Sequence, residues 1–579
     1  MTVTIDSGSV IGGSAGGVGI NVLGGASNSI TNRGTIGAAS GNALRAGSGS
    51  ESLANYGTLT GDVDLGGGSN TINNYSGASF NSLASIVVGA GRSFINAGVL
   101  SPGGAQAAQS TLLTGNLQQQ AGGAYHVDFS LAGGDSDHLS VSGSALLAGS
   151  IRVMPIDTGT VRIGNGQSTV LTAADGTTID QLTLIAPASP LVSYRLVYPN
   201  SNEVAIASQT DFAPATLGNN AGRMGAYLNA IQKAGGSSAL APIIAALFKL
   251  PDTASLRVAY EKLGTGALGN QGSVAANASL GFNDALHSCR QRDGEYRFSR
   301  EGECEWMRLG GSIRDQDRTD DNAGFRQDTL TLAGGLQHAI AADRYFGFGL
   351  AYQKSTLDSS YSDQDGERFE GGLILKRIDG PTRISGSLTA SYGRYDSRRL
   401  VDIATPGLRA KGRQELWSVS LQGRISHDLA FGEREYLRPM LGLGVTYVAR
   451  DSYHERGAGA ANLYVASGDD TFVALQPAIE FGGERRIGDE GSLLRHFVRL
   501  GITHFLGSNE RRLSARLEGA PAGVEPFTVI TRSDRTYGDL ALGIDLLRKD
   551  GTTARLEYNG QFSSNSNTHA IGLKLSMPF

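Results

Sequence analysis

The sequence contains few cysteines, few aromatic residues and no long apolar run. Its two cysteines, Cys289 and Cys304, are too few for a structural zinc site of four thiol ligands, and neither C-x-x-C nor another metal-binding spacing is present. No stretch of eighteen apolar residues occurs, which excludes a transmembrane helix. A chain of this kind can cross a membrane only as strands.

Charge and composition narrow the class of protein further. Aromatic residues make up 7% of the chain and charged residues 18%, whereas glycine occurs 82 times, a mixture typical of short strands and tight turns. The net charge of −5 argues against a nucleic-acid-binding face. Lysine is absent before Lys233 but common, with arginine, from Arg290 onward, so we expect separate N- and C-terminal domains. Residues 1–10 have neither the basic start nor the apolar core of a signal peptide, which predicts a processed or truncated chain.

A short pattern around asparagine recurs through the first hundred residues. Asn32, Asn55, Asn74 and Asn96 lie in similar apolar contexts and are separated by 23, 19 and 22 residues. A repeat of about twenty residues is the size of one turn of a parallel β-helix, in which stacked turns bury apolar side chains that one turn cannot. Asn and Gly are expected at the corners, where a positive φ is tolerated. The alternative is low-complexity disorder, because glycine and serine are frequent.

Residues 121–207 alternate more regularly, for example over 138–146, which predicts a stable cap on the last turns of the stack. Within them, residues 134–136 (Gly-Asp-Ser) could form a nucleophile turn, with His126 or His138 as the base. A catalytic serine needs a base and an orienting group at hydrogen-bond distance. Because so short a match is common by chance, we interpret it as a polar turn before a strand.

The hydrophobic period becomes helical over residues 217–264, for instance at Met224, Tyr227, Leu228 and Ile231. The following segment, residues 272–288, is rich in Ala, Ser and Asn. A helix of such small residues can lie in a narrow tube.

From Cys304 onward apolar residues recur at every second position, which predicts long strands with one apolar and one polar face. Both a soluble sandwich and a membrane barrel have this alternation. The strands are expected near residues 304–314, 326–340, 344–357, 366–378, 382–396, 412–428, 435–449, 471–487, 494–507, 534–548, 553–563 and 568–579.

The connections favour the barrel. Long polar loops near residues 315–325, 358–365, 397–411, 450–470 and 508–533 alternate with short turns, as in outer-membrane barrels. Twelve is an even number, as closure of an antiparallel barrel with both ends on one side requires. The chain also ends on an apolar ladder with a terminal aromatic residue: Ile571, Leu573, Leu575, Met577 and Phe579.

In this order the segments resemble the type Va (monomeric) autotransporters of Gram-negative bacteria. Residues 137–145 (DHLSVSGSA) are similar to the family's strand motif before the barrel, and residues 150–208 resemble its autochaperone region. The terminal Met577-Pro578-Phe579 resembles the signal read by the barrel-assembly machinery.

The resemblance implies an all-β chain with a helical linker. A right-handed parallel β-helix passenger is expected first, and a twelve-stranded antiparallel transmembrane barrel with a helix in its pore follows it. The expected divisions are a passenger over 1–120, an autochaperone-like end over 121–210, a linker over 211–268, a pore helix over 269–290 and a barrel over 291–579.

The resemblance also implies a function, secretion of the passenger through its own barrel, driven by folding outside rather than by ATP. The expected location is the outer membrane, with the passenger exposed at the surface or released. The expected partners are outer-membrane lipid, the barrel-assembly machinery, periplasmic chaperones and host or bacterial surface ligands, for a monomer without cofactors, metals or nucleic acid. The passenger is expected to be adhesive or structural. An esterase or protease passenger, or a solute-conducting porin, is the alternative.

Few individual residues can be assigned roles. Cys289 and Cys304 are expected to form a disulfide between the pore helix and the first strand. Leu575, Met577 and Phe579 are expected to form the assembly signal. Some members of the family that the chain resembles cut themselves at an Asn in the pore. Asn277, followed by Ala278, is the candidate here and Asn283 the alternative, with Glu370, Asp539, Asp545 or Glu557 as the acid. Otherwise Asn277 only lines the pore and the chain is not an enzyme.

Overall fold

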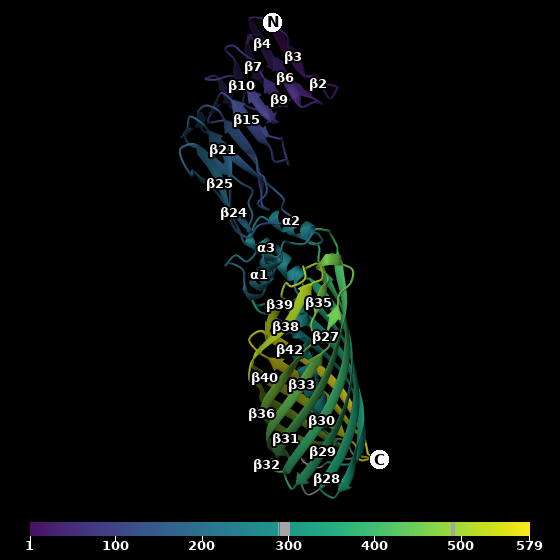
Figure 1. Cartoon of the computed structure of the whole chain (residues 1–579). Helices are drawn as coiled ribbons and strands as arrows, with labels where there is room; N and C mark the ends of the chain where they lie inside the picture. The colour runs from purple at the N-terminus through teal and green to yellow at the C-terminus, as the bar shows by residue number, and fades with distance from the viewer. Residues whose placement is uncertain (288, 290–300, 488–491, 579) are drawn as a thin grey trace. The chain divides into compact units, whose positions relative to one another are not determined.

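The computed structural model describes residues 1–287, 289, 301–487 and 492–578. The chain divides into two compact units (Figure 1): Met1–Pro214 with Leu228–Leu256, and Ala215–Tyr227 with Arg257–Phe579. Among the described residues no helix is both long enough and apolar enough to cross a membrane.

Unit one is a parallel β-helix with sheets that run along its length. The first sheet consists of β1 (Thr2–Ile5), β4 (Ser27–Asn32), β7 (Ser50–Asn55), β10 (Thr71–Asn74), β13 (Ser93–Asn96), β16 (Asn116–Gln119), β19 (Ala145–Leu147) and β22 (Thr177–Ile179). The second consists of β2 (Ser9–Gly12), β5 (Thr35–Ala38), β8 (Thr58–Thr60), β11 (Ser79–Ser82), β14 (Val99–Pro102), β17 (Ala124–Ser130), β20 (Ser150–Ile156) and β23 (Thr183–Ile185).

The third sheet begins parallel and ends in an antiparallel hairpin. It consists of β3 (Ile20–Val22), β6 (Asn42–Ala46), β9 (Asp62–Asp64), β12 (Ser85–Val87), β15 (Ser110–Thr114), β18 (His138–Val141), β21 (Gly164–Ala173), β25 (Glu203–Thr210) and β24 (Val192–Val197). Strand β25 pairs antiparallel with both β21 and β24. The hairpin therefore covers the edge that the last parallel strand of this sheet would otherwise expose.

In the core of the β-helix, apolar side chains of successive turns stack along each sheet. In the first sheet Ile30, Leu53, Ile72, Phe94 and Leu117 pair in register and are at most 1% exposed. The period of about twenty residues follows from this stacking, because each turn covers the apolar side chain of the turn before it. The predicted β-helix is confirmed.

The recurring asparagines form a buried amide ladder. Asn32 Nδ2 donates to Asn55 Oδ1 at 2.7 Å, Asn55 to Asn74 at 2.8 Å and Asn74 to Asn96 at 2.8 Å. These residues end strands β4, β7, β10 and β13, and none of them has a positive φ. The expectation that Asn provides left-handed corners is therefore wrong. Asn is needed because its amide can donate and accept along a buried column.

The glycines next to this ladder have a different purpose. Gly34 and Gly57 do not have a positive φ, but a Cβ at either position would collide with backbone of the preceding turn. Glycine is needed here because the turns approach one another closely.

Replacing Asn74 by Ala should destabilise the β-helix by about 1–3 kcal/mol. It removes the donor to the buried Asn96 Oδ1 and one of the two acceptors of Asn55 Nδ2, which keeps only the Ser79 carbonyl. The urea midpoint of pulse proteolysis, read from an N-terminal epitope on the full chain, measures this. Asn73→Ala is the control, because Asn73 lies on the half-exposed outer face. Equal midpoints for the two variants would contradict the ladder's role.

The helices follow the β-helix in the chain: α1 (Asn219–Lys233), α2 (Ala241–Phe248), α3 (Thr253–Leu263), the 3-10 helix η1 (Gly266–Asn270) and α4 (Gln271–Leu286). The first three have the helical period that the sequence predicts. Within unit two, α3 is followed directly by η1 and α4, which lead to the barrel strands.

Unit two is a closed antiparallel barrel (Figure 1). Among the described residues its twelve long strands are β26 (Cys304–Gln316), β27 (Phe325–Ala341), β28 (Arg344–Ser359), β29 (Ser362–Asp379), β30 (Thr382–Leu400), β31 (Arg409–His427), β33 (Glu435–Arg450), β36 (Gly468–Ile487), β37 (Ser492–Leu506), β40 (Thr536–Leu547), β41 (Thr553–Phe562) and β42 (Ser566–Met577). Strand β42 pairs with β26 and closes the sheet. A three-residue strand, β32 (Leu429–Phe431), extends the turn before β33. The predicted twelve-stranded barrel is confirmed.

Three of the predicted long loops differ from their prediction. The expected long loop at 358–365 is mostly strand, since β28 and β29 continue to Ser359 and from Ser362. Polar residues on both faces concealed this extension. The loops expected at 450–470 and 508–533 form a small sheet of β34 (Tyr453–His454), β35 (Leu463–Val465), β38 (Glu510–Leu517) and β39 (Phe527–Arg532), with the 3-10 helix η2 (Gly459–Ala461). We call this sheet the loop sheet.

Candidate functional site

The lumen of the barrel contains helix α4. Most of its side chains are buried against the wall, and eight of its sixteen residues are Gly, Ala or Ser, as the sequence predicted for a helix in a narrow tube. Ala275 and Ala276 lie in a cluster with Tyr395, Leu416 and Phe472. Farther along, Phe282 and Leu286 lie in a cluster with Trp306 and Ile374. At the first level large wall side chains therefore meet small helix side chains. At the second, the large helix side chains also pack against wall glycines, Gly349 and Gly372.

Polar contacts fix the depth of the helix. Ser279 Oγ accepts a hydrogen bond from Arg368 Nη2 at 2.6 Å, and Ser387 Oγ donates to Asn283 Oδ1 at 2.7 Å. At the end of the helix, Lys574 Nζ donates to the carbonyl of Ala285 at 3.1 Å. A cation at this end also interacts favourably with the helix dipole. Sliding the helix by one turn would leave these buried groups without partners, so its register in the pore is defined.

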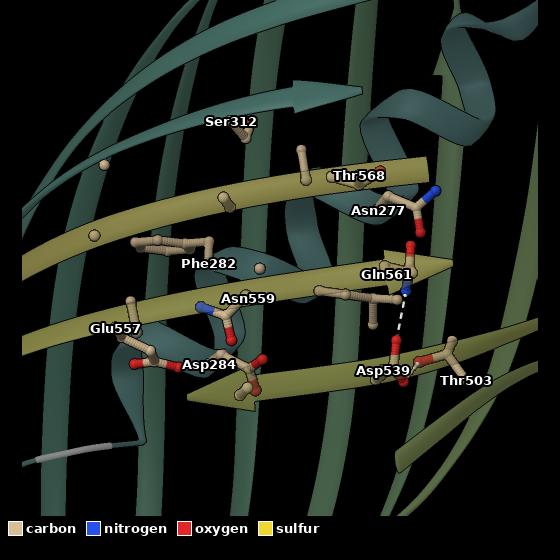
Figure 2. Close-up of a pocket in the computed structure, with 18 of the residues that line it drawn as sticks. Asn277, Phe282, Asp284, Ser312, Thr503, Asp539, Glu557, Asn559, Gln561 and Thr568 are labelled. Carbon is tan, nitrogen blue, oxygen red and sulfur yellow. Dashed lines mark hydrogen bonds between the residues drawn. The ribbon is translucent and has the colours of Figure 1, made fainter. Parts of the chain in front are cut away.

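The helix lies off centre in the pore. It contacts strands β28–β31 and β33, whereas Asn277, Ala278, Gly281 and Asp284 form a face that is only partly buried. Between this face and the opposite wall is a cavity of about 400 Å³ (Figure 2). Polar and charged side chains from β26, β36, β37 and β40–β42 line that wall.

The cavity contains some of the residues proposed for self-cleavage. Asn277 points into it near Gln561, and Gln561 Nε2 donates to Asp539 Oδ1 at 3.0 Å (Figure 2). Glu557 also lines the cavity. Asn283 is buried against the wall and bonded to Ser387, so it is less available than Asn277.

The remaining acids lie elsewhere. Glu370 is paired with Arg368 at 3.0 Å, and Asp545 accepts a 2.8 Å hydrogen bond from Arg555 Nη2. Neither belongs to the cavity lining. Of the four acidic candidates, the structure thus brings only Asp539 and Glu557 to the cavity that Asn277 faces.

The loop sheet binds the segment of the chain that precedes α4. Asn220 Nδ2 donates to the carbonyl of Ile530 at 2.7 Å and Asn220 Oδ1 accepts from its N–H at 2.9 Å, as a neighbouring strand would. Thr531 Oγ1 donates to the carbonyl of Gly269 at 3.2 Å. Sequence reasoning missed this contact, although the alternation of Leu513, Ala515 and Leu517 was a signal for a strand.

At the other end of α4, Cys289 and Cys304 form a disulfide with Cα atoms 6.0 Å apart. Beside it the Glu301 carboxylate is buried between Lys376 at 3.1 Å and Arg383 at 3.3 Å. The chain after the helix is therefore attached to the first strand and to the wall.

The assembly-signal residues that the structure describes lie on the closing strand. Leu575 and Met577 are exposed on the outer face of β42, opposite Met307 and Glu305 of β26. Phe579 lies outside the described residues.

The Gly-Asp-Ser turn has no catalytic geometry. Ser136 Oγ accepts from the Ser130 N–H at 3.0 Å, while His138 Nε2 lies 3.3 Å from Thr172 Oγ1. The neighbouring Asp137 accepts from the N–H groups of Gln109 and Asp128, both at 2.8 Å, and burial raises the pKa of Asp137 to about 7. These residues hold two loops together. In the ranges with assigned structure, no group of three or more His, Cys, Asp or Glu side chains could hold a metal ion.

The outer surface of the barrel is an apolar belt. Large side chains such as Leu330, Leu350, Phe369, Leu421 and Ile571 point outward and are about half exposed. A closed barrel with this belt, long loops at one end and short turns at the other is a protein of the outer membrane.

Comparison with known proteins gives the family. Residues 306–559 match the family model described as Autotransporter beta-domain. Residues 306–559 are therefore an autotransporter β-domain, and a parallel β-helix precedes this domain in the chain.

Solved structures similar to the chain include translocator domains. That of NalP from Neisseria meningitidis is 14% identical, with a TM-score of 0.43, and the match covers 53% of this chain and 98% of that one. The transport unit of AIDA-I from Escherichia coli is 13% identical, with a TM-score of 0.37, over 55% of this chain and 100% of that one. A comparison with curated protein sequences finds no match.

The contact between helix and wall can be tested with matched substitutions on α4. Ala276→Leu should overpack the wall face and lower stability by about 1–3 kcal/mol, whereas Ala278→Leu points a side chain of equal size into the cavity. The temperature at which the heat-modifiable gel band shifts should fall for the first variant only. Equal shifts would contradict the off-centre position of the helix.

Proposed function

We propose that this autotransporter translocates residues 1–210 through its own barrel and displays them, still attached, at the cell surface. The observation that supports this is the helix α4, which occupies the pore and continues on its N-terminal side into the segment that the loop sheet holds. In this position the C-terminal end of α4 lies at the side of the membrane with the short turns. The chain before α4 leaves the pore at the side with the long loops.

The folding of the β-helix is proposed to drive export. Each new turn covers apolar side chains of the previous turn and closes the backbone hydrogen bonds between them. The capping segment is the part expected to fold first, since the chain exits C-terminus first. Partly folded turns outside the membrane would then prevent the chain from sliding back.

A structural or adhesive passenger is favoured over an enzyme. The described part of the β-helix has short connections, and its Ser136 and His138 are bonded to other groups. A solute-conducting porin is a poor alternative, because α4 fills much of the lumen and is fixed by buried contacts.

Export can be tested in cells with a substitution in the cap. Leu139→Asp places a charge at a fully buried position of β18, which should unfold the cap and lower the protease-accessible passenger several-fold. Leu112→Asp is the control, because Leu112 is half exposed on β15. Barrel insertion, read from heat-modifiable mobility, should be equal in both. Undiminished display of the Leu139 variant would contradict folding-driven export.

Attachment can be tested by mass spectrometry of the barrel fraction. Asn277 lies in the middle of the continuous helix α4, a conformation that opposes attack of its side chain on its own carbonyl, so we expect only intact chain. A new N-terminus at Ala278, absent from the Asn277→Asp variant, would instead establish self-cleavage with release of the passenger.

A further inference from the structure

One corner of the β-helix carries an exposed column of side chains, one from each turn. The column consists of Arg33, Tyr56, Tyr75, Ala97 and Gln120, each of which directly follows a residue of the amide ladder or its continuation at Gln119. The backbone N–H of each donates to the carbonyl of the ladder position one turn earlier, at 2.7–2.9 Å. The residues are therefore stacked in register along the helix axis.

The first three residues of the column form a continuous stack. The rings of Tyr56 and Tyr75 are parallel within 3°, with centroids 4.2 Å apart, and the guanidinium of Arg33 lies 5.5 Å from the centre of the Tyr56 ring. Tyr56 is 44% and Tyr75 38% exposed. Both faces of Tyr56 are thus covered, whereas the second face of Tyr75 is directed toward the turn of Ala97.

That turn lacks a side chain that could continue the stack. Ala97 has only a methyl group and is followed by Gly98, while the next turn presents the exposed side chain of Gln120. Backbones of neighbouring strands are about 4.8 Å apart, so the backbones at Tyr75 and Gln120, two turns apart, are separated by about 9.6 Å. A ring needs about 3.5–4.0 Å to its neighbour on each side, so one ring fits between them. We call this space the Ala97 slot.

We propose that the Ala97 slot binds a pyranose ring of a glycan. A pyranose presents a face of C–H groups, which can lie on the open face of Tyr75, and hydroxyl groups, which can bond with the amide of Gln120. This names the class of ligand for the adhesive passenger and so rests on the proposed function.

The charge of the β-helix favours a neutral sugar over a nucleobase. Acidic side chains outnumber basic ones in residues 1–210. Arg33, the charged member of the column, lies 3.4 Å from the carboxylate of Asp6, and Asn73, Ser76 and Gln118 are uncharged. A nucleic acid needs basic side chains to bind its phosphates, whereas a glycan does not.

Binding can be measured by saturation-transfer NMR on the full chain. The chain is kept in an amine-oxide detergent, because glycoside detergents would compete, and the probes are the methyl pyranosides of glucose, galactose, mannose and N-acetylglucosamine. At least one probe should receive saturation on its ring C–H protons. The signal should fall at least five-fold in Tyr75→Ala. It should fall equally in Ala97→Tyr, which fills the slot with the ring that continues the stack.

Tyr198→Ala is the control, because Tyr198 is at least as exposed as Tyr75 (46% against 38%) but lies outside the column. No saturation of any probe by the folded wild-type chain would overturn the proposal, as would an undiminished signal in Ala97→Tyr. Export in cells is measured separately. A displayed chain that binds no probe refutes the slot alone, and a chain that binds but is not displayed refutes the proposed secretion alone.

Discussion

Both units of this chain depend on one constraint: a β-strand must not leave its backbone N–H and C=O groups without partners. The barrel meets it by pairing β42 with β26, which removes every edge from the lipid-facing sheet. The β-helix meets it by stacking parallel turns and ending its third sheet with the hairpin β24–β25. Even the loop sheet follows the rule, because the amide of Asn220 pairs with Ile530 at the edge of β39.

The helix in the pore meets the same constraint. Within α4 the backbone N–H and C=O groups bond to one another, so the wall needs to supply only a complementary shape and a few side-chain contacts. Alternating large and small residues give the shape, and Ser279, Asn283 and the Ala285 carbonyl give the contacts. Because α4 packs mainly on strands β28–β31 and β33, the helix is attached to that part of the wall, while a polar cavity remains along the rest.

Much of this architecture could be predicted from the sequence because it repeats. The asparagine spacing indicated the β-helix, and alternation from Cys304 indicated the barrel. The purpose of Asn74 could not be predicted, since Asn is also typical of turns, and only coordinates show its amide bonded to the next turn. The strand pairing of the loop sheet depends on contacts between distant segments, which no local pattern encodes. The same is true of the acids, since Asp539 lines the cavity and Asp545 does not.

The amide ladder has a consequence for how such a chain can vary. Its turns contain 23, 19 and 22 residues, and yet Asn32, Asn55, Asn74 and Asn96 stay in register. The differences in length are absorbed by the connections between strands, where no stacked side chain is displaced. The β-helix therefore behaves as a fixed frame with adjustable spacers. Insertions of odd or even length can accumulate in its connections without turning any strand inside out, so new surface can be added while the core remains the same.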